Sequence, residues 1–196
     1  MTVDYSDISP KEIYKLMSQS IIPRPVAWIV TQKDGVINAA PFSYFTALSS
    51  RPPTVVVSIG HKADGSPKDT LRNLRETGRC TLCLAQDSQM AALHATSKSL
   101  PAEQSETETF GIATRAVEKE YPPMIEGVPV AFFCTLLQEI DLKESKTIPV
   151  ILRIEKQYFD DDIVKDKERL RLAYEPLARV GAAYAKLGEM MEPPAI

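Results

Sequence analysis

Apolar and polar positions along the chain predict a protein built mostly from β-strands. Short runs of β-branched and other apolar residues, bounded by turn formers, are typical of strands; they occupy residues 26–31, 54–59, 79–85, 128–140 and 147–159. The run at 54–59 is almost continuously apolar, which predicts burial on both faces. Residues 36–49 form another extended stretch, which follows a hairpin turn at Gly35 and which we expect Pro41 to interrupt.

Two segments carry helical signals instead. Residues 6–20 have apolar positions near a 3.6-residue period, and Pro10 suits the first turn of a helix. Residues 66–78 begin with Ser66, an expected helix cap, and end at Gly78. Many strands with few helices between them favour a barrel or sandwich over a doubly wound sheet. The expected fold class is therefore mainly β with helical excursions.

Length and composition are those of one ordinary globular domain, so we expect a single domain over residues 1–196, with a helical segment at 1–20 and a frayed tail at 186–196. The polar stretch 97–109 is interpreted as a long surface loop. A net charge of −3 without a basic face argues against nucleic acid as a partner. The chain shows no signal peptide and no apolar run of membrane-spanning length, so we expect a cytoplasmic protein.

Cysteine and histidine offer no recognisable metal or catalytic site. Cys80 and Cys83 lie in a strand-like run, where residues three apart point to opposite faces, so we expect core thiols rather than a redox pair. Cys134 is expected in the core as well. The two histidines stand without a further Cys/His cluster, which predicts no metal site. No residue is identified as catalytic.

The start of the helix predicted at 66–78 is a candidate anion site. A helix N-terminus offers free N–H donors and partial positive charge, to which Lys68 adds a full charge and Thr70 a hydroxyl. A phosphate cradle is one interpretation, and a capped surface helix that binds nothing is the other. The preceding stretch 60–67 has the glycine spacing of a P-loop but lacks the Lys-Ser/Thr pair, so nucleotide hydrolysis is excluded.

Several segments, taken in order, resemble one known family. They are IPRPVAWIVT at 22–31, NAAPFSYF at 38–45, SSRPP at 49–53, KDTLRN at 68–73 and YEPLARVG at 174–181. Each motif is weak alone, but their order and spacing resemble the flavin-reductase-like domain, the FMN-binding split barrel that includes flavoredoxin-type proteins. The resemblance implies a Greek-key split β-barrel.

The resemblance also implies where a flavin binds, with FMN favoured over FAD. The isoalloxazine ring would lie along the irregular strand and at the end of the next strand, and the phosphate at the helix start, with Arg24 as a second cationic group near ring or phosphate. The implied ring residues are Asn38, Ser43, Tyr44, Phe45, Thr46, Ser58 and Gly60, and the implied phosphate residues are Lys68, Asp69 and Thr70. Thr46 and Ala182 depart from the family's usual pattern.

By the same resemblance, NADH or NADPH would transfer a hydride to flavin N5, and the protein would form a homodimer with flavin near the subunit interface. Three alternatives stay open: an electron carrier reduced by a redox partner protein, a flavin-binding module without turnover, and a structural domain that has lost the cofactor.

Overall fold

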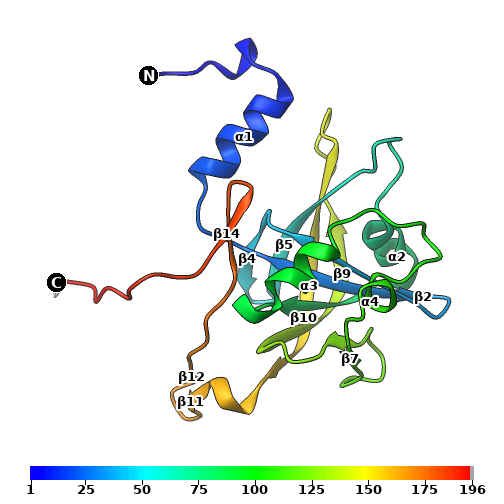
Figure 1. Cartoon of the computed structure of the whole chain (residues 1–196), viewed down its shortest axis with the longest axis vertical. Coiled ribbons are helices and arrows are strands. Elements are labelled where there is room, and N and C mark those ends of the chain that lie inside the picture. Colours follow the sequence, from blue (N-terminus) through cyan, green and yellow to red (C-terminus); the bar gives the residue numbers. More distant parts are fainter. Residues whose placement is uncertain (195–196) are drawn as a thin grey trace.

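The computed structural model describes residues 1–194 and has a seven-stranded antiparallel sheet as its main body, in the order β3-β2-β6-β9-β10-β5-β4 (Figure 1). The strands are β2 (Ala27–Lys33), β3 (Val36–Phe42), β4 (Phe45–Ser50), β5 (Pro53–Gly60), β6 (Arg79–Leu84), β9 (Val130–Glu139) and β10 (Thr147–Phe159). This arrangement confirms the mainly β prediction.

The connection between β3 and β4 forces the sheet to curl into a barrel. These strands lie at opposite edges of the sheet, yet only Ser43 and Tyr44 separate them. The Tyr44 carbonyl accepts a hydrogen bond from the Ser58 N–H at 2.9 Å, which holds the connection against β5. Pro41 does not interrupt the extended stretch as expected, because it pairs with Trp28 inside β3. An edge strand tolerates the missing N–H of proline.

Strand β5 contradicts the expectation of burial on both faces. Val55, Val57 and Ile59 are buried in the barrel core, whereas Val56 and Ser58 alternate with them and are only half-buried. The alternation of side chains along a strand explains the result, because the second face of β5 turns away from the core. That face contributes to a cavity.

The cysteines lie where the sequence predicts. Cys80 belongs to the core cluster that includes Val57 and Leu71, whereas Cys83 belongs to the cluster around Trp28. Cys134 stands directly opposite Cys80 across the β6–β9 pair. All three thiols are buried and free.

Helix α2 (Asp69–Thr77) packs against β2, but it begins later than predicted. Ser66 does not cap it, because the Ser66 hydroxyl and N–H both bond the Asp64 carboxylate, at 2.6 and 2.9 Å. Pro67 pairs with His61 in an isolated bridge, which keeps the chain extended up to the helix. Gly78 ends α2 in the left-handed conformation, as predicted.

Helix α1 (Pro10–Ser20) confirms the N-terminal helix from residue 10 onward, with Ser9 and Glu12 forming a capping box. It follows η1 (Tyr5–Asp7) and stands apart from the barrel (Figure 1). A three-stranded sheet lies at its foot, made of β1 (Arg24–Pro25), β13 (Ala178–Val180) and β14 (Ala183–Ala185).

Smaller elements complete the chain. They are η2 (Asp87–Gln89), α3 (Met90–Ala95), α4 (Glu106–Thr109), the pair β7 (Thr114–Arg115) and β8 (Met124–Ile125), η3 (Asp161–Ile163), and the pair β11 (Val164–Asp166) and β12 (Arg171–Leu172). The stretch 97–109 is therefore not only a surface loop, because it ends in α4 with Glu106 buried. Residues 186–194 are exposed and irregular, and 195–196 of the predicted tail lie outside the described residues. Within 1–194 no helix combines the length and apolarity needed to span a bilayer.

Candidate functional site

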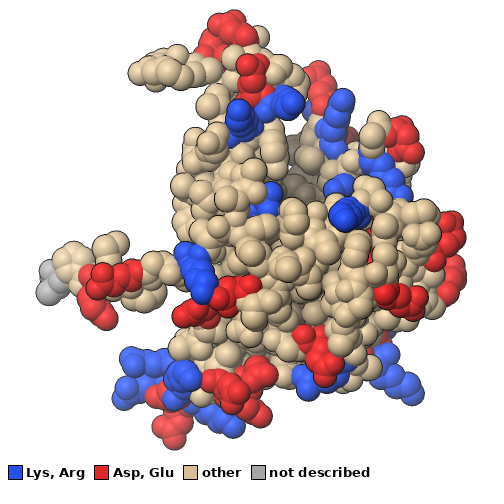
Figure 2. Space-filling view, viewed as in Figure 1, with Lys and Arg blue, Asp and Glu red and all other residues tan. Residues whose placement is uncertain are grey.

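Two hollows adjoin the β3–β4 connection. One, here called the basic pocket, has a volume of about 80 Å³ and is lined by Asn38, Pro41, Lys62, Lys68, Asp69, Thr70, Lys98 and Glu106 among others. The other, the apolar cavity, has a volume of about 440 Å³ and is lined by Met17, Ile21, Arg24, Ser43, Tyr44, Phe45, Thr46, Val56 and Ser58 among others. Pro41 and Ser43 are two residues apart, so β3 leads directly from one hollow to the other. Figure 2 shows Lys and Arg side chains bordering the hollowed upper part of one face.

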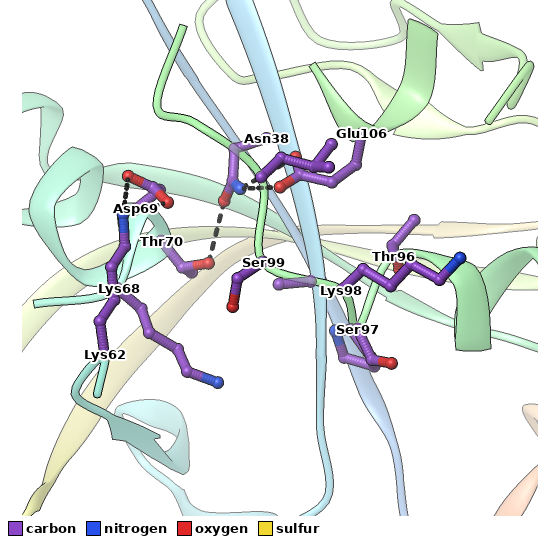
Figure 3. A pocket seen from close by; sticks show the side chains of 13 residues that line it. Asn38, Lys62, Lys68, Asp69, Thr70, Thr96, Ser97, Lys98, Ser99 and Glu106 are labelled. Carbon is purple, nitrogen blue, oxygen red and sulfur yellow. Dashed lines mark hydrogen bonds and ion pairs between the residues drawn. The ribbon is translucent and has the colours of Figure 1, made fainter. Parts of the chain in front are cut away.

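Lys68, at the start of α2, is a cation of the basic pocket that is available to a ligand. Lys62 is held by the Asp69 carboxylate at 2.9 Å, and Asp69 also pairs with Arg72 at 2.8 Å. Lys68 makes no ion pair within residues 1–194 and lies with its Nζ 5.6 Å from the centre of the Phe42 ring. Its amine extends away from Asp69 in Figure 3.

The start of α2 adds free donors to the same pocket. In the described part of the chain no side chain caps this helix, and the first helical hydrogen bond runs from the Arg72 N–H to the Lys68 carbonyl at 3.0 Å. The preceding N–H groups of the first turn have no partner within the helix, as at any helix start. Together with Lys68 they form an anion-binding arrangement.

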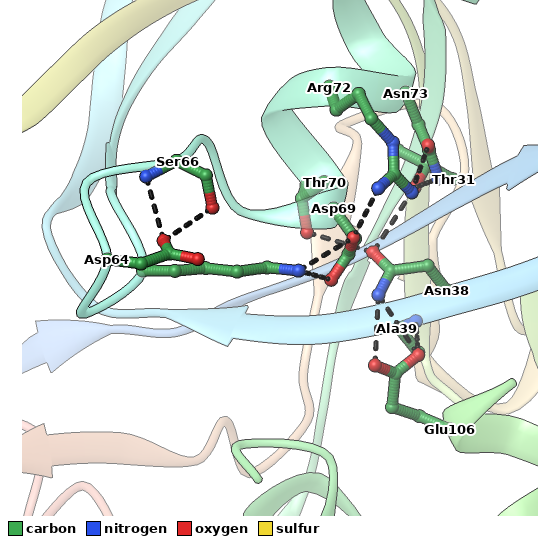
Figure 4. Close-up of polar contacts among 11 residues, drawn as sticks. Thr31, Asn38, Ala39, Asp64, Ser66, Asp69, Thr70, Arg72, Asn73 and Glu106 are labelled. Atoms are coloured by element: carbon green, nitrogen blue, oxygen red, sulfur yellow. Dashed lines mark hydrogen bonds and ion pairs between the residues drawn. The ribbon is translucent and has the colours of Figure 1, made fainter. Parts of the chain in front are cut away.

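A buried polar network forms the wall of the basic pocket (Figure 4). Both oxygens of the Glu106 carboxylate accept from Asn38 Nδ2 at 3.0 Å, and Oε2 also accepts from the Ala39 N–H at 3.1 Å. Asn38 Oδ1 accepts from Thr70 Oγ1 at 2.9 Å and from Thr31 Oγ1 at 3.3 Å. Burial raises the pKa of Glu106 above its ordinary value.

This network changes the expected role of two residues. The single hydroxyl proton of Thr70 is engaged by Asn38, so the Thr70 side chain does not offer a free proton to the pocket. The Asn38 side chain likewise faces protein groups on both sides. Sequence reasoning missed Glu106, because it stands in a polar stretch where only Ser105, the cap of α4, signals local structure.

Arg24 forms a wall of the apolar cavity and is 4% exposed, so it is not a surface arginine. Its guanidinium donates to the carbonyl oxygens of Ser18, Ile21 and Gly181, the last two at 2.7 and 3.3 Å. The Nε of Arg24 has no partner among the described residues. The buried hydroxyl of Tyr44, in the same cavity, also has none. Burial raises the pKa of Tyr44, which further disfavours loss of the phenol proton that the hydroxyl would donate.

The sequence-predicted site residues divide between the two hollows, with one exception. The apolar cavity takes Arg24, Ser43, Tyr44, Phe45, Thr46 and Ser58, and the basic pocket takes Asn38, Lys68, Asp69 and Thr70. Gly60 lines neither hollow. A Cβ at this position would meet Thr147 Cγ2 at an ordinary 3.8 Å, so the fold itself does not require glycine there.

Comparison with known proteins places the chain among flavin-related proteins. The model of the Flavin reductase like domain matches residues 17–185. Protein BH2278 of Halalkalibacterium halodurans is 32% identical, over 96% of this chain and 93% of that protein. Nitrilotriacetate monooxygenase component B from Bacillus cereus superposes with a TM-score of 0.91 at 31% identity, over 98% of each chain.

A further solved structure identifies the architecture. A flavin reductase with a split barrel domain from Shewanella frigidimarina superposes with a TM-score of 0.79 at 18% identity, over the whole of both chains. Agreement over the full length at this identity concerns the fold alone. It confirms the predicted split β-barrel.

Proposed function

Because this chain belongs to the flavin reductase like domain family, we propose that it binds FMN, with the isoalloxazine ring in the apolar cavity and the phosphate in the basic pocket. The observation that carries the proposal is that Pro41 lines the basic pocket and Ser43, two residues further on, lines the apolar cavity, so the two hollows adjoin at the end of β3. The apolar cavity, at about 440 Å³, falls in the range of small-molecule sites. The basic pocket beside it supplies Lys68 and the open start of α2.

The apolar cavity fits the polar edge of a flavin ring. Arg24 Nε and the Tyr44 hydroxyl are buried donors without a partner in residues 1–194, and both residues line this cavity. A buried donor left unpaired costs about 1–3 kcal/mol, which a ligand carbonyl or ring nitrogen would recover. Flavin carries such acceptors along one edge of an otherwise apolar ring.

The bound flavin would supply the redox chemistry, while the chain binds and orients it. Arg24 and the backbone N–H groups of the β3–β4 connection would favour negative charge added to the ring. We propose NADH or NADPH as the hydride donor, and reduced flavin passing to an acceptor. The relative at 31% identity is a component of a monooxygenase, which supports an oxygenase as one such acceptor.

Anaerobic mixing of the FMN-loaded protein with NADH and NADPH tests this reaction. Bleaching of the visible flavin absorption supports the reductase. Bound FMN that bleaches only with a reduced redox protein identifies an electron carrier, and bound FMN without bleaching by any donor identifies a binding module. Purified protein that neither carries nor binds FMN would contradict the whole proposal and leave a structural domain.

The phosphate placement has its own test. Lys68→Ala should weaken FMN binding about tenfold or more, because a charge-assisted hydrogen bond contributes about 1.5–3 kcal/mol. Riboflavin has the same ring and no phosphate, so its affinity should not change. Lys143→Ala, an exposed lysine in the β9–β10 connection, is the matched control. Equal losses for FMN and riboflavin would place the phosphate elsewhere.

We also propose a cytoplasmic homodimer. Apolar side chains on α1, directly after it and on β4 support the dimer, because Tyr14, Ile21, Ile22 and Leu48 are 47–57% exposed. Sedimentation equilibrium measures the mass directly, and a monomer at micromolar concentration would contradict the dimer.

A further inference from the structure

The basic pocket contains a carboxylate that an anion-binding site does not need. Glu106 lines this pocket and is 5% exposed. A phosphate bound there would bring a second negative charge close to it in a region of reduced dielectric. Two like charges that lie close together disfavour each other's ionised form.

No cation neutralises Glu106 within the described chain. Lys62 pairs with Asp69, and Asp69 with Arg72. Lys68 lies over Phe42 and Lys98 over Phe110, with Nζ 5.6 and 5.7 Å from the ring centres. The partners of the carboxylate are instead neutral N–H donors from Asn38 and Ala39. The negative charge of ionised Glu106 is therefore not compensated by a cation, and a ligand in the pocket experiences it.

The carboxylate also fixes the direction of the hydrogen bonds beside the pocket. An ionised carboxylate only accepts, so Asn38 must turn its NH₂ group toward Glu106 and its carbonyl oxygen toward Thr70. Thr70 must then donate its proton to Asn38 and present lone pairs elsewhere. If Glu106 were protonated, Asn38 could reverse its amide and donate to Thr70, which would free the Thr70 proton for a phosphate.

We infer that Glu106 is a positioning residue. While its carboxylate is ionised, it lowers the affinity of the basic pocket for the flavin phosphate, so that FMN is held as an exchangeable ligand. The inference rests on the proposed function. Two effects act with the same sign, because the charge repels the phosphate and the hydrogen-bond direction withholds the Thr70 proton. Burial and the nearby charge of Asp69 raise the pKa of Glu106, so that its carboxylate gains and loses its charge closer to neutral pH.

Glu106→Gln removes the charge and keeps the shape. Equilibrium titration at neutral pH should give a Kd for FMN about tenfold lower than in the wild type, the scale of one charge pair at partly screened distance. The Kd for riboflavin should be the same in both proteins. The ratio of wild-type to variant Kd for FMN should fall toward one as the pH drops through the pKa of Glu106. The ionisation of the free phosphate is common to both titrations and cancels in this ratio.

Thr70→Val supplies a second variant should Glu106→Gln fail to fold. The inference expects the ratio of the Thr70→Val to the wild-type Kd for FMN to rise as the pH falls through the pKa of Glu106, because only then does the wild-type hydroxyl offer its proton to the phosphate. A ratio that does not vary with pH would overturn it. A hydroxyl that contacts the phosphate directly would instead lose affinity at every pH.

The outcomes separate this inference from the function beneath it. If neither protein binds FMN, the proposed function fails. If FMN binds but Glu106→Gln leaves its Kd unchanged, or changes FMN and riboflavin alike, the positioning role is overturned while the flavin site stands.

Discussion

The Nη2 atom of Arg24 donates a hydrogen bond to the carbonyl oxygen of Gly181 at 3.3 Å, although 157 residues separate the two in the chain. Nη1 of the same guanidinium reaches the carbonyls of Ser18 and Ile21 at the end of α1. One buried side chain thus joins α1, β1 and the β13–β14 turn. Since Arg24 also lines the apolar cavity, the placement of α1 and the shape of the cavity depend on the same contacts.

Arg24→Lys should lower the free energy of unfolding by about 3 kcal/mol, because the single nitrogen of lysine cannot occupy the positions of both Nη1 and Nη2 and leaves a buried acceptor unpaired. Urea denaturation followed by circular dichroism measures the loss. Arg153→Lys, at a side chain that is 49% exposed, is the control and should change stability by less than about 0.5 kcal/mol. Equal losses of unfolding free energy in the two variants would show that the hydrogen bonds of Arg24 do not cause the destabilisation.

Gly181→Ala should destabilise the protein by about 1–2 kcal/mol, since Gly181 has a φ of 54° that alanine adopts only with strain. Its new Cβ would also lie 3.2 Å from Gln19 Cγ on α1. Thermal unfolding of Gly188→Ala gives the matched comparison, because that glycine has no atom within 4 Å of a built Cβ and no positive φ. A neutral Gly181→Ala would mean that the β13–β14 turn is free to move away from α1.

The sequence was sufficient for elements whose signals are local. Strand β10 spans the predicted residues 147–159, and Gly78 ends α2 as its conformational freedom requires. The start of α2 was not predictable in the same way. The Ser66 side chain could either cap the helix or bond a neighbouring group. Its hydroxyl donates to the nearby carboxylate of Asp64 in a turn instead of capping α2.

The candidate site was predictable where it follows one stretch of chain and not where tertiary packing builds it. Residues 43–46 line the apolar cavity together, because they form one connection. Glu106 meets Asn38 across 68 residues only after α4 packs on β3, and a polar sequence around it gives no signal of burial. The engagement of Arg24 by three carbonyls arises in the same manner.

Tyr44→Phe should weaken FMN and riboflavin equally, by about fivefold, the contribution of one hydrogen bond to the ring. The stability of the flavin-free protein should not fall, because the substitution removes a buried hydroxyl that has no partner in residues 1–194. Fluorescence titration with both flavins measures the effect, and Tyr121→Phe, which lines neither hollow, is the control. A loss for FMN alone would instead connect Tyr44 with the phosphate.

Glu106 should make stability fall with rising pH in the range just above 4.5, its ordinary pKa. Burial raises its pKa in the folded protein, so the native state binds more protons than the unfolded state in this window. The contribution is full below the ordinary value and is lost as pH rises through the folded one. The difference in urea stability between wild type and Glu106→Gln isolates this slope from other carboxylates. A difference that does not vary between pH 4.5 and 7 would contradict a raised pKa.

The three buried cysteines should be unreactive in the native protein. Burial raises the pKa of Cys83 to about 12, and the contact with Cys134 together with burial raises that of Cys80. The nucleophilic thiolate is therefore scarce at pH 8. A thiol-specific disulfide reagent also cannot reach these sulfur atoms unless the barrel opens. Reaction with a disulfide reagent should proceed only at the rate of unfolding, whereas all three thiols should react at once in guanidinium chloride. Lys143→Cys, on the exposed β9–β10 connection, should add one rapidly reacting thiol under native conditions. Rapid modification of the wild-type protein would mean that β6 separates from its neighbours far more often than a packed core strand allows.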